Sequence, residues 1–582
     1  MFLKKSFRKD SGRTYLSIVK KVRNPKSGVS SDVSIESIGY LDDLSEQYSD
    51  PIAHFREIAR KMTEEENARR KIALTLDMDE CLPMNTDNRK NFGYVALLKI
   101  YHELELDRFF NNKARHQGFK YNINSIMQLL VISRILSPGS KKKAFEGKHR
   151  FFERFDFSLV DVYRSLSYFA SIAKDAQRHI NEKVSACYGR DTSTIYYDVS
   201  NFYFEIDQED ALRKRGVSKE HRPAPIVQMG LAMDADGVPL HYELFPGNTQ
   251  DKSTFRSVIG EVRRNYDTGR IIVVADMGII TGDNIFYLVG GEKREKPLNG
   301  YVFSFSVRGG TDEFKNYVLD QTGYLDKNRK VAKEDADFKI KSRRIAREIN
   351  VTMTNGKMAR KTVYEKQVVF WSQKHADKAK ADRENALLKA RTLVKYPSMY
   401  NKSTSYGAAK YVKDIAFDKK TGEIITAGKH PVFNEAKLLE EEKYDGYYSI
   451  VTSELEMSDR EIVDTYRGLW EIEESFRITK GTLEARPVYV SRQDRIEAHF
   501  LTCFIALVIM RLLQKQTRHR YSCEKITDCL NRISCSNEQE NIYLFDYRSD
   551  ISDEIGKAFA IDFSKKRLRL SELKNIIATC KK

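Results

Sequence analysis

The sequence predicts an α/β fold, and three observations support this prediction. Residues 194–197 form a β-prone run, and residues 271–275 form a fully apolar run of the kind found in strands covered on both faces of a sheet. Between them, Asp236-Gly237 separates two further apolar runs and is a strong signal for a hairpin turn. Together these features favour strands and helices mixed within one domain.

Each element of this predicted core has a local signal. Strands are predicted at residues 194–198, 202–204, 227–233, 240–245, 271–275 and 301–307. A helix is predicted at residues 251–265, with Asp251 as a candidate N-cap, because its carboxylate can accept from the free N–H groups of the first turn. After residue 308 the pattern is interrupted by Lys- and Arg-rich strands (338–349, 361–371) and a charged helix (375–393).

The chain resumes its core pattern near residue 441. A strand at residues 447–452 precedes two long helices, at 458–480 and 491–516. The last seventy residues are charged and give no clear structural signal.

The region before the core has two parts. Residues 1–50 alternate as β-strands do, with a turn signal at Asn24-Pro25, and residues 93–190 show helical spacing of apolar side chains. The basic turn at Lys141-Lys142-Lys143 suits docking on DNA. A helical scaffold with a solvated charge run fits this segment equally well.

The chain carries a large positive surplus, because its 582 residues include 99 Lys and Arg against 82 Asp and Glu, for a formal net charge of +17. Such a surplus favours a polyanionic partner through counterion release. A merely soluble basic protein is the alternative. The longest apolar run, residues 500–510, is shorter than the ~20 residues that span a bilayer, so it predicts a buried core helix and no membrane partner. Seven scattered cysteines without a CxxC pair predict free thiols, not a zinc site.

Two aspartates follow apolar strands of the predicted core. Asp198 ends the first run and Asp276 ends the fully apolar one, and a sheet presents side chains to a cleft at such strand ends. Taken singly, an Asp in this position is more often a turn former. A third carboxylate farther along the chain would let the two aspartates take part in a shared metal site.

That third site lies on the helix predicted at residues 458–480. Residues seven apart return to nearly the same helix face, so Tyr466, Glu473 and Lys480 form one stripe, with Arg477 beside it. The carboxylate can hold a metal ion, and the phenol and cations can hold phosphate oxygens. A solvated face with helix-stabilising ion pairs is the bland alternative.

Four segments between residues 190 and 510 resemble a known family and follow the family's order. They are Tyr197-Asp198-Val199-Ser200, Phe245-Pro246-Gly247-Asn248-Thr249-Gln250-Asp251, Val274-Ala275-Asp276-Met277-Gly278, and the helix with Tyr466, Trp470-Glu471-Ile472-Glu473-Glu474 and Lys480. These segments resemble DDE-type insertion-sequence transposases, a cut-and-paste family with a Tyr-Arg-Glu-Lys signature. Leu469 departs from the signature, which has Arg there. Arg467 lies about 120° off the stripe, which leaves Arg477 or Arg486 for the phosphate contact.

The resemblance implies an RNase H-like mixed sheet flanked by helices, interrupted by a β-rich insertion domain and preceded by a β-plus-helical region. The implied catalytic and metal-binding residues are Asp198, Asp276 and Glu473, and the implied DNA-binding residues are Tyr466, Arg477, Lys480 and Asn248. Three carboxylates without a Cys or His cluster select Mg²⁺ or Mn²⁺. Two ions about 4 Å apart would serve an in-line displacement at phosphorus.

The implied function is that of a DNA transposase. It would bind the ends of an insertion sequence, cleave DNA by metal-dependent hydrolysis and join the 3′-hydroxyl ends to target DNA. Its partners would be double-stranded DNA and, on that DNA, a second copy of the chain, in the cytoplasm of a bacterium and associated with the nucleoid. Two alternatives stay open: a nuclease of the same fold without strand transfer, and a catalytically inactive DNA-binding repressor derived from a transposase.

The same interpretation divides the chain into six segments. They are an N-terminal β-containing region (1–85), a helical and DNA-binding region (86–190), two parts of the catalytic core (191–308 and 441–515), the insertion domain (309–440) and a C-terminal tail (516–582). Near the motifs, Tyr197, Trp470 and His499 are assigned to packing. Asn248 and Asp251 are candidates for contact with DNA or metal, and the alternative is that a turn and a helix cap account for both without any function.

Overall fold

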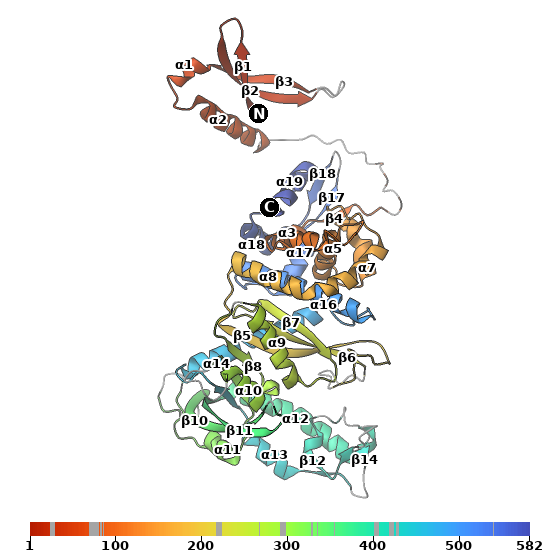
Figure 1. Cartoon of the computed structure of the whole chain (residues 1–582), viewed down its shortest axis with the longest axis vertical. Coiled ribbons are helices and arrows are strands. Elements are labelled where there is room, and N and C mark those ends of the chain that lie inside the picture. Colours follow the sequence, from red (N-terminus) through yellow and green to blue (C-terminus); the bar gives the residue numbers. More distant parts are fainter. Residues whose placement is uncertain are drawn as a thin grey trace. The chain divides into compact units, whose positions relative to one another are not determined.

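Two units make up the chain in the computed structural model (Figure 1), residues 1–86 and residues 87–582. The structure describes residues 1–23, 30–68, 79, 81, 84, 86–216, 224–266, 268–290, 298–326, 330–333, 336–353, 355–400, 405, 407–417, 424–425, 430–538 and 541–582. The turn predicted at Asn24-Pro25 lies outside these residues, as does most of the segment 69–85.

The N-terminal unit is a three-stranded antiparallel meander with one long helix. Its elements are β1 (Phe2–Arg8), β2 (Arg13–Arg23), β3 (Ser30–Tyr40), α1 (Leu41–Ser45) and α2 (Pro51–Ala68), and the sheet order is β1-β2-β3. Leu16 and Ile18 alternate along β2 and are fully buried, as is Ala59 of α2. The strands predicted for residues 1–50 are present.

The second unit begins with a strand and a group of helices. They are β4 (Arg89–Asn91), α3 (Tyr94–Glu103), α4 (Leu106–Ala114), α5 (Ile123–Leu136), α6 (Lys141–Glu146), the 3₁₀ turn η1 (Gly147–Arg150), α7 (Leu159–Ser171) and α8 (Ala173–Tyr188). The long helix α16 (Gln493–Gln516) packs against α3, α5 and α7. Among the described residues α16 alone is long and apolar enough to cross a membrane, but nearly all of it is buried in the protein. It is a core helix, as residues 500–510 predict.

An eight-stranded mixed sheet forms the centre of this unit. Its strands are β5 (Thr194–Tyr203), β6 (Ile226–Met233), β7 (Pro239–Pro246), β8 (Ile272–Ala275), β9 (Gly300–Phe305), β10 (Phe338–Thr352), β11 (Met358–Ser372) and β16 (Tyr447–Thr452), in the order β10-β11-β16-β9-β8-β5-β6-β7. β5 is parallel to β8 and β8 to β9, whereas β6 is antiparallel to both β5 and β7. This order and these directions give the RNase H-like sheet that the sequence predicts.

Helices cover both faces of the sheet. α9 (Asp251–Asn265) and α10 (Gly282–Val289) pack on one face, and α14 (Asp459–Arg467), α15 (Trp470–Lys480) and α16 pack on the other. Side chains of β5 alternate between the two cores: Ile195 and Tyr197 belong to the α9 side, whereas Tyr196 and Phe202 belong to the α16 side. Strand alternation therefore assigns every residue of β5 to a face.

The segment predicted as a β-rich insertion contains the two longest strands of the chain. β10 and β11 form a hairpin, and β11 also pairs with β16, so this hairpin extends the central sheet. The rest of the segment holds α11 (Asp312–Leu319), α12 (Gln373–Lys395), α13 (Glu435–Glu442), the 3₁₀ turns η3 (Pro397–Met399) and η4 (Ala409–Tyr411), and the short strands β12 (Val412–Lys413), β13 (Ala416–Phe417), β14 (Ile424–Ile425) and β15 (Val432–Phe433). The four short strands form two separate two-stranded sheets.

Residues after α16 fold into a second sheet with helices. The elements are α17 (Cys523–Arg532), β17 (Ser534–Asn537), β18 (Ile542–Phe545), α18 (Asp550–Phe559), β19 (Arg567–Arg569) and α19 (Leu570–Cys580). The sheet order is β19-β18-β17-β4, so its last strand comes from the start of the unit. Asn91, which pairs with Ser534 of β17, also ties β4 to α17, because its Nδ2 donates to the carbonyl oxygen of Leu530 at 2.8 Å.

Candidate active site

Asp198 and Asp276 lie side by side on neighbouring strands. β5 and β8 are parallel, and their register pairs Tyr197 with Ala275, so the two aspartates occupy the next position along each strand. Tyr197 and Ala275 face the α9 side of the sheet. Because side chains alternate between faces, both carboxylates face the other side, which α14 and α15 cover.

The strand that carries Asp198 is longer than predicted. Two strands were expected, at residues 194–198 and 202–204, but β5 runs without a break from Thr194 to Tyr203. The prediction of two strands is wrong because β6 pairs with the whole second half of β5. The last pair joins Tyr203 of β5 to Ile226 of β6. Asp198 is therefore a mid-strand residue, while Asp276 follows the last residue of β8.

Asp276 is held by neighbours on two elements. Ser304 of β9 donates its hydroxyl to Oδ1 of Asp276 at 2.6 Å, and the backbone N–H of Met277 donates to the same oxygen at 2.8 Å. The Tyr466 hydroxyl of α14 donates to this oxygen at 3.4 Å. These hydrogen-bonding groups form a row that continues to Tyr448 of β16, because the Tyr448 hydroxyl lies 2.8 Å from the Tyr466 hydroxyl.

The two phenols of this row are neutral hydrogen-bonding groups. Burial raises the pKa of Tyr466, and the nearby Tyr448 and Asp276 raise it further. Burial likewise raises the pKa of Tyr448, and the charges of Asp276 and Glu473 add to this rise. Both phenols therefore keep their protons near neutral pH and can donate to a carboxylate or to a phosphate oxygen.

Glu473 reaches the same neighbourhood from a helix. It lies on α15, which packs against β5, and its charge acts on Tyr448 together with that of Asp276. The Glu473 side chain is exposed, and across the described parts of the chain no group of three or more His, Cys, Asp and Glu side chains is assembled closely enough to hold a metal ion. The two aspartates are thus neighbours, and the glutamate stands beside them without closing a three-carboxylate cluster.

A comparison with protein families gives this arrangement a context. A family model described as "Transposase DDE domain" matches residues 213–509, which is just over half of the chain. The chain belongs to the transposase DDE-domain family. Asp276 and Glu473 lie inside the range that matches, and Asp198 lies shortly before it. No curated protein matches this member of the family.

The helix that carries the last motif of this DDE-family chain is broken. One helix was predicted over residues 458–480, but α14 ends at Arg467 and α15 begins at Trp470. The prediction fails here because the Tyr196 hydroxyl donates at 3.2 Å to the Thr465 carbonyl oxygen, which a continuous helix would offer to the N–H of Leu469. Gly468 allows the ring of Tyr196 to approach, since an added Cβ would meet Oη at 2.0 Å. The backbone tightens at the break: the N–H of Glu471 donates to the Gly468 carbonyl oxygen at 3.1 Å. Tyr466 and Glu473 therefore belong to two different helices.

The basic residues of the predicted stripe have separate surroundings. Lys480 ends α15, and its Nζ lies 5.5 Å from the ring centre of Phe202 on β5. Arg477 is exposed and pairs with Glu474 at 3.4 Å, so its guanidinium is bound to a carboxylate other than Glu473. Leu469, at the position where the signature has Arg, is 6% exposed and contributes to the core.

Three other predicted residues divide between surface and core. Asn248 is exposed in the turn after β7, in which the N–H of Thr249 donates to the Pro246 carbonyl oxygen at 2.9 Å. Trp470 is 55% exposed, so its assignment to packing is wrong: it begins α15 on the side away from the core. His499 is buried and bonded to the Ala485 carbonyl oxygen, as expected for a core histidine.

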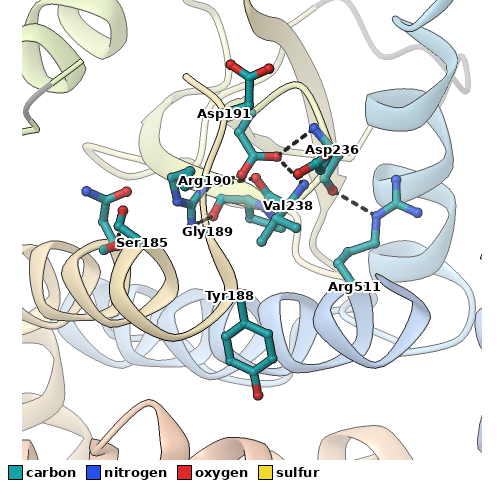
Figure 2. Close-up of polar contacts among 12 residues, drawn as sticks. Ser185, Tyr188, Gly189, Arg190, Asp191, Asp236, Val238 and Arg511 are labelled. Atoms are coloured by element: carbon teal, nitrogen blue, oxygen red, sulfur yellow. Dashed lines mark hydrogen bonds and ion pairs between the residues drawn. The ribbon is translucent and has the colours of Figure 1, made fainter. Parts of the chain in front are cut away.

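α15 is anchored by a buried arginine that sequence reasoning missed. Figure 2 shows Arg511 extending from α16 toward the turn between β6 and β7 that contains Asp236. Its Nε donates to the Gly237 carbonyl oxygen at 3.0 Å and Nη2 to the Glu471 carbonyl oxygen at 2.8 Å. It also forms an ion pair with the Glu471 carboxylate. Only 1% of the Arg511 side chain is exposed, so it links α15, α16 and the turn from within the core.

The sequence carries signals for these missed residues. Arg511 follows a mostly apolar run without charged residues at 500–510, where a lone charge needs buried partners. Ser304 would follow from the alternation of β9 once β9 is placed beside β8, because Ala275 pairs with Phe303. Tyr448 has no comparable local signal, because its place depends on β16 pairing with β9 across the insertion.

Proposed function

We propose that this chain is a DNA transposase that binds the ends of an insertion sequence, cleaves DNA by hydrolysis and joins the freed 3′-hydroxyl ends to target DNA. The main support is the register of β5 and β8, which gives Asp198 and Asp276 adjacent positions on one face of the sheet. Further support comes from α15, because it packs on β5 and carries Glu473. An insertion sequence has two ends, and we propose that one copy of the chain binds each of them. A homodimer on DNA is therefore part of the proposal.

The three carboxylates form an oxygen-only donor set of the kind that hard divalent cations prefer. Asp198, Asp276 and Glu473 would hold Mg²⁺ or Mn²⁺, as two ions, and bound ions of this type would activate the attacking oxygen and stabilise charge at phosphorus. Two observations fit such a group. The two aspartates are adjacent, and Ser304 and Met277 both donate to one oxygen of Asp276, which leaves its other oxygen for a ligand.

The protein's own residues would orient the DNA. Tyr466 and Tyr448 offer neutral hydroxyls beside Asp276, and Lys480 offers a cation at the end of α15. In cleavage, a water oxygen forms a bond to phosphorus while the bond from phosphorus to the 3′ oxygen breaks, and this oxygen leaves as a hydroxyl after taking up a proton. In joining, that 3′ hydroxyl loses its proton and its oxygen bonds to a target phosphorus, while the bond from this phosphorus to the target 3′ oxygen breaks and that oxygen leaves as a hydroxyl after taking up a proton.

The central test replaces one carboxylate. Asp198→Asn keeps the shape of the side chain but removes the charge, so we expect loss of Mn²⁺-dependent cleavage of a DNA that carries the element's ends, with DNA binding retained. Asp464→Asn is the matched control, because Asp464 is an acidic residue of α14 that pairs with Arg467 at the surface. Unchanged cleavage by Asp198→Asn would remove Asp198 from the mechanism.

A strand-transfer assay separates the proposal from its alternatives. With paired ends and a target plasmid, a transposase gives joined products. Cleavage without joined products would identify a nuclease, and binding without any cleavage would identify a repressor.

A further inference from the structure

An open pocket of about 530 Å³ lies in the second unit, away from the three carboxylates. Its residues come from β4, η1, the last turn of α17 and the segments next to β17 and β18, and they include Arg89, Arg150, Arg532 and Tyr547. None of the residues in the candidate active site lines it. The family match does not include it either, because all of its lining residues precede position 213 or follow position 509.

The arginines of this pocket differ in what they bind. Arg89 forms an ion pair with Asp546 at 2.7 Å. Arg150 and Arg532 form no ion pair with any carboxylate among the described residues. Asp87 and Asp546 also line the pocket, and Arg150 lies near enough to Asp87 for their charges to interact. Three guanidinium groups against two carboxylates leave the pocket a net positive charge that can attract an anion, and each guanidinium fork can bind two oxygens of a phosphate.

Arg532 is held in place by an aromatic ring. Its guanidinium carbon lies 4.2 Å from the ring centre of Tyr547, and the Tyr547 hydroxyl donates to Oγ of Ser549 at 3.1 Å. Stacking uses the face of the guanidinium and leaves its N–H edge available for hydrogen bonds. The cation is therefore oriented before a ligand arrives, which lowers the entropy cost of binding.

The scaffold beneath the pocket is rigid. The N–H of Phe92 donates to the Ile533 carbonyl oxygen at 2.8 Å, immediately after α17 ends. Gly93 packs so closely on α17 that an added Cβ would lie 2.1 Å from the Leu530 carbonyl oxygen. Arg89 and Arg532 therefore project from segments that are locked together, as a preformed binding site requires.

Charge distinguishes this pocket from a neighbouring hollow that shares Asn531 with it. The neighbour lies between α15 and α17 and is lined by Glu474, Glu484, Glu524 and Asp528, with Arg477 as its one basic residue. An acidic hollow repels a phosphate backbone. A phosphate ligand is therefore expected in the arginine pocket and not in the acidic hollow between α15 and α17.

We infer that Arg150 and Arg532 bind a backbone phosphate of the DNA on which the proposed transposase acts. This inference rests on the proposed function, which supplies DNA as the partner. The contact is independent of base sequence, because phosphates carry no sequence information, and it positions the duplex on the C-terminal sheet. It also gives residues 516–582 a role in DNA binding.

The test measures DNA affinity of the full chain over a range of salt concentrations, with a short duplex of arbitrary sequence. For the double variant Arg150→Ala and Arg532→Ala we expect affinity about tenfold weaker, and a slope of log affinity against log salt that is lower by about 1, since the two residues share one phosphate and each phosphate contact contributes about 0.9. Replacing both residues by Lys keeps the charge, so the slope should be retained.

The matched control removes two arginines that are already paired. Arg548 pairs with Asp553 and Arg567 with Glu538, so their double Ala variant makes the same change in net charge in the same part of the chain. Its salt slope should stay at the wild-type value. If the Arg150 and Arg532 variant also keeps affinity and slope, the inference is overturned while the proposed function stands. If wild-type protein binds no duplex, both are overturned.

Discussion

Tyr466 connects α14 to the carboxylate of Asp276 through a single hydroxyl. That hydroxyl lies 3.4 Å from Oδ1 of Asp276 and 2.8 Å from the hydroxyl of Tyr448. Tyr466→Phe removes it and keeps the ring. Removing one positioned donor beside reacting charge commonly costs about 100- to 1,000-fold in rate, so we expect single-turnover DNA cleavage to slow by at least about tenfold. Folding stability should change by no more than about 1.5 kcal/mol.

The control for this variant is Tyr489→Phe. Tyr489 is 71% exposed, so its hydroxyl is in solvent and its loss should leave the cleavage rate at the wild-type value. Equal rates for Tyr466→Phe and wild-type protein would show that the hydroxyl has no part in the reaction.

At the scale of elements, the position of α15 depends on Arg511. This side chain bonds the Gly237 and Glu471 carbonyl oxygens and pairs with the Glu471 carboxylate inside the core. Arg511→Met fills the space but leaves those acceptors without a donor. Removing one partner of a buried pair typically costs about 3–5 kcal/mol, so we expect urea unfolding to show a loss of about 3 kcal/mol, and α15 to lose its fixed position.

An exposed pair provides the comparison for Arg511. Arg520 pairs with Glu554 at 3.2 Å, and over half of the Arg520 side chain is exposed. Arg520→Met should cost no more than about 1 kcal/mol, as surface pairs do. A similarly small loss in Arg511→Met would contradict the role of Arg511 as an anchor.

At the scale of the whole molecule, local patterns predicted the strands but not their long-range neighbours. Apolar runs identified β8, and Asp236-Gly237 identified the β6–β7 hairpin, because both signals lie within a few residues. The break at Gly468 was missed, because it depends on Tyr196, which is remote in sequence. The C-terminal sheet was missed because β17 pairs with β4 from the opposite end of the unit.

In the candidate site too, local sequence signals predicted some residues, whereas others depend on contacts between remote segments. Asp198, Asp276 and Glu473 were predicted from strand ends, helix spacing and motif order, and their role stays a prediction. Ser304 and Tyr448 emerge only from strand order across the sheet. The pocket of Arg150 and Arg532 also joins remote segments, so neither arginine has a local signal that distinguishes it from a surface residue.

A buried lysine of the helical region contacts a buried histidine of α16. Nζ of Lys141 on α6 lies 2.6 Å from Nδ1 of His499 on α16, and Nε2 of His499 donates to the Ala485 carbonyl oxygen at 3.0 Å. Burial lowers the pKa of Lys141 to about 7, and the charge of Arg134 lowers it further, opposed weakly by Cys503. Burial also lowers the pKa of His499. The folded protein therefore holds a neutral Lys141 above about pH 7.

This contact makes stability depend on pH in a definite direction. Between the folded pKa of about 7 and the ordinary value of 10.5, the unfolded chain binds a proton at Lys141 that the folded chain does not bind. Stability should therefore rise with pH across this window, by up to about 1.4 kcal/mol per pH unit, and urea unfolding at several pH values measures the slope. Lys141→Met should abolish this part of the rise. Lys142→Met should keep it, because Lys142 is exposed and only loosely paired with Glu146. Parallel slopes for wild-type and Lys141→Met proteins would mean that Lys141 stays protonated in the fold.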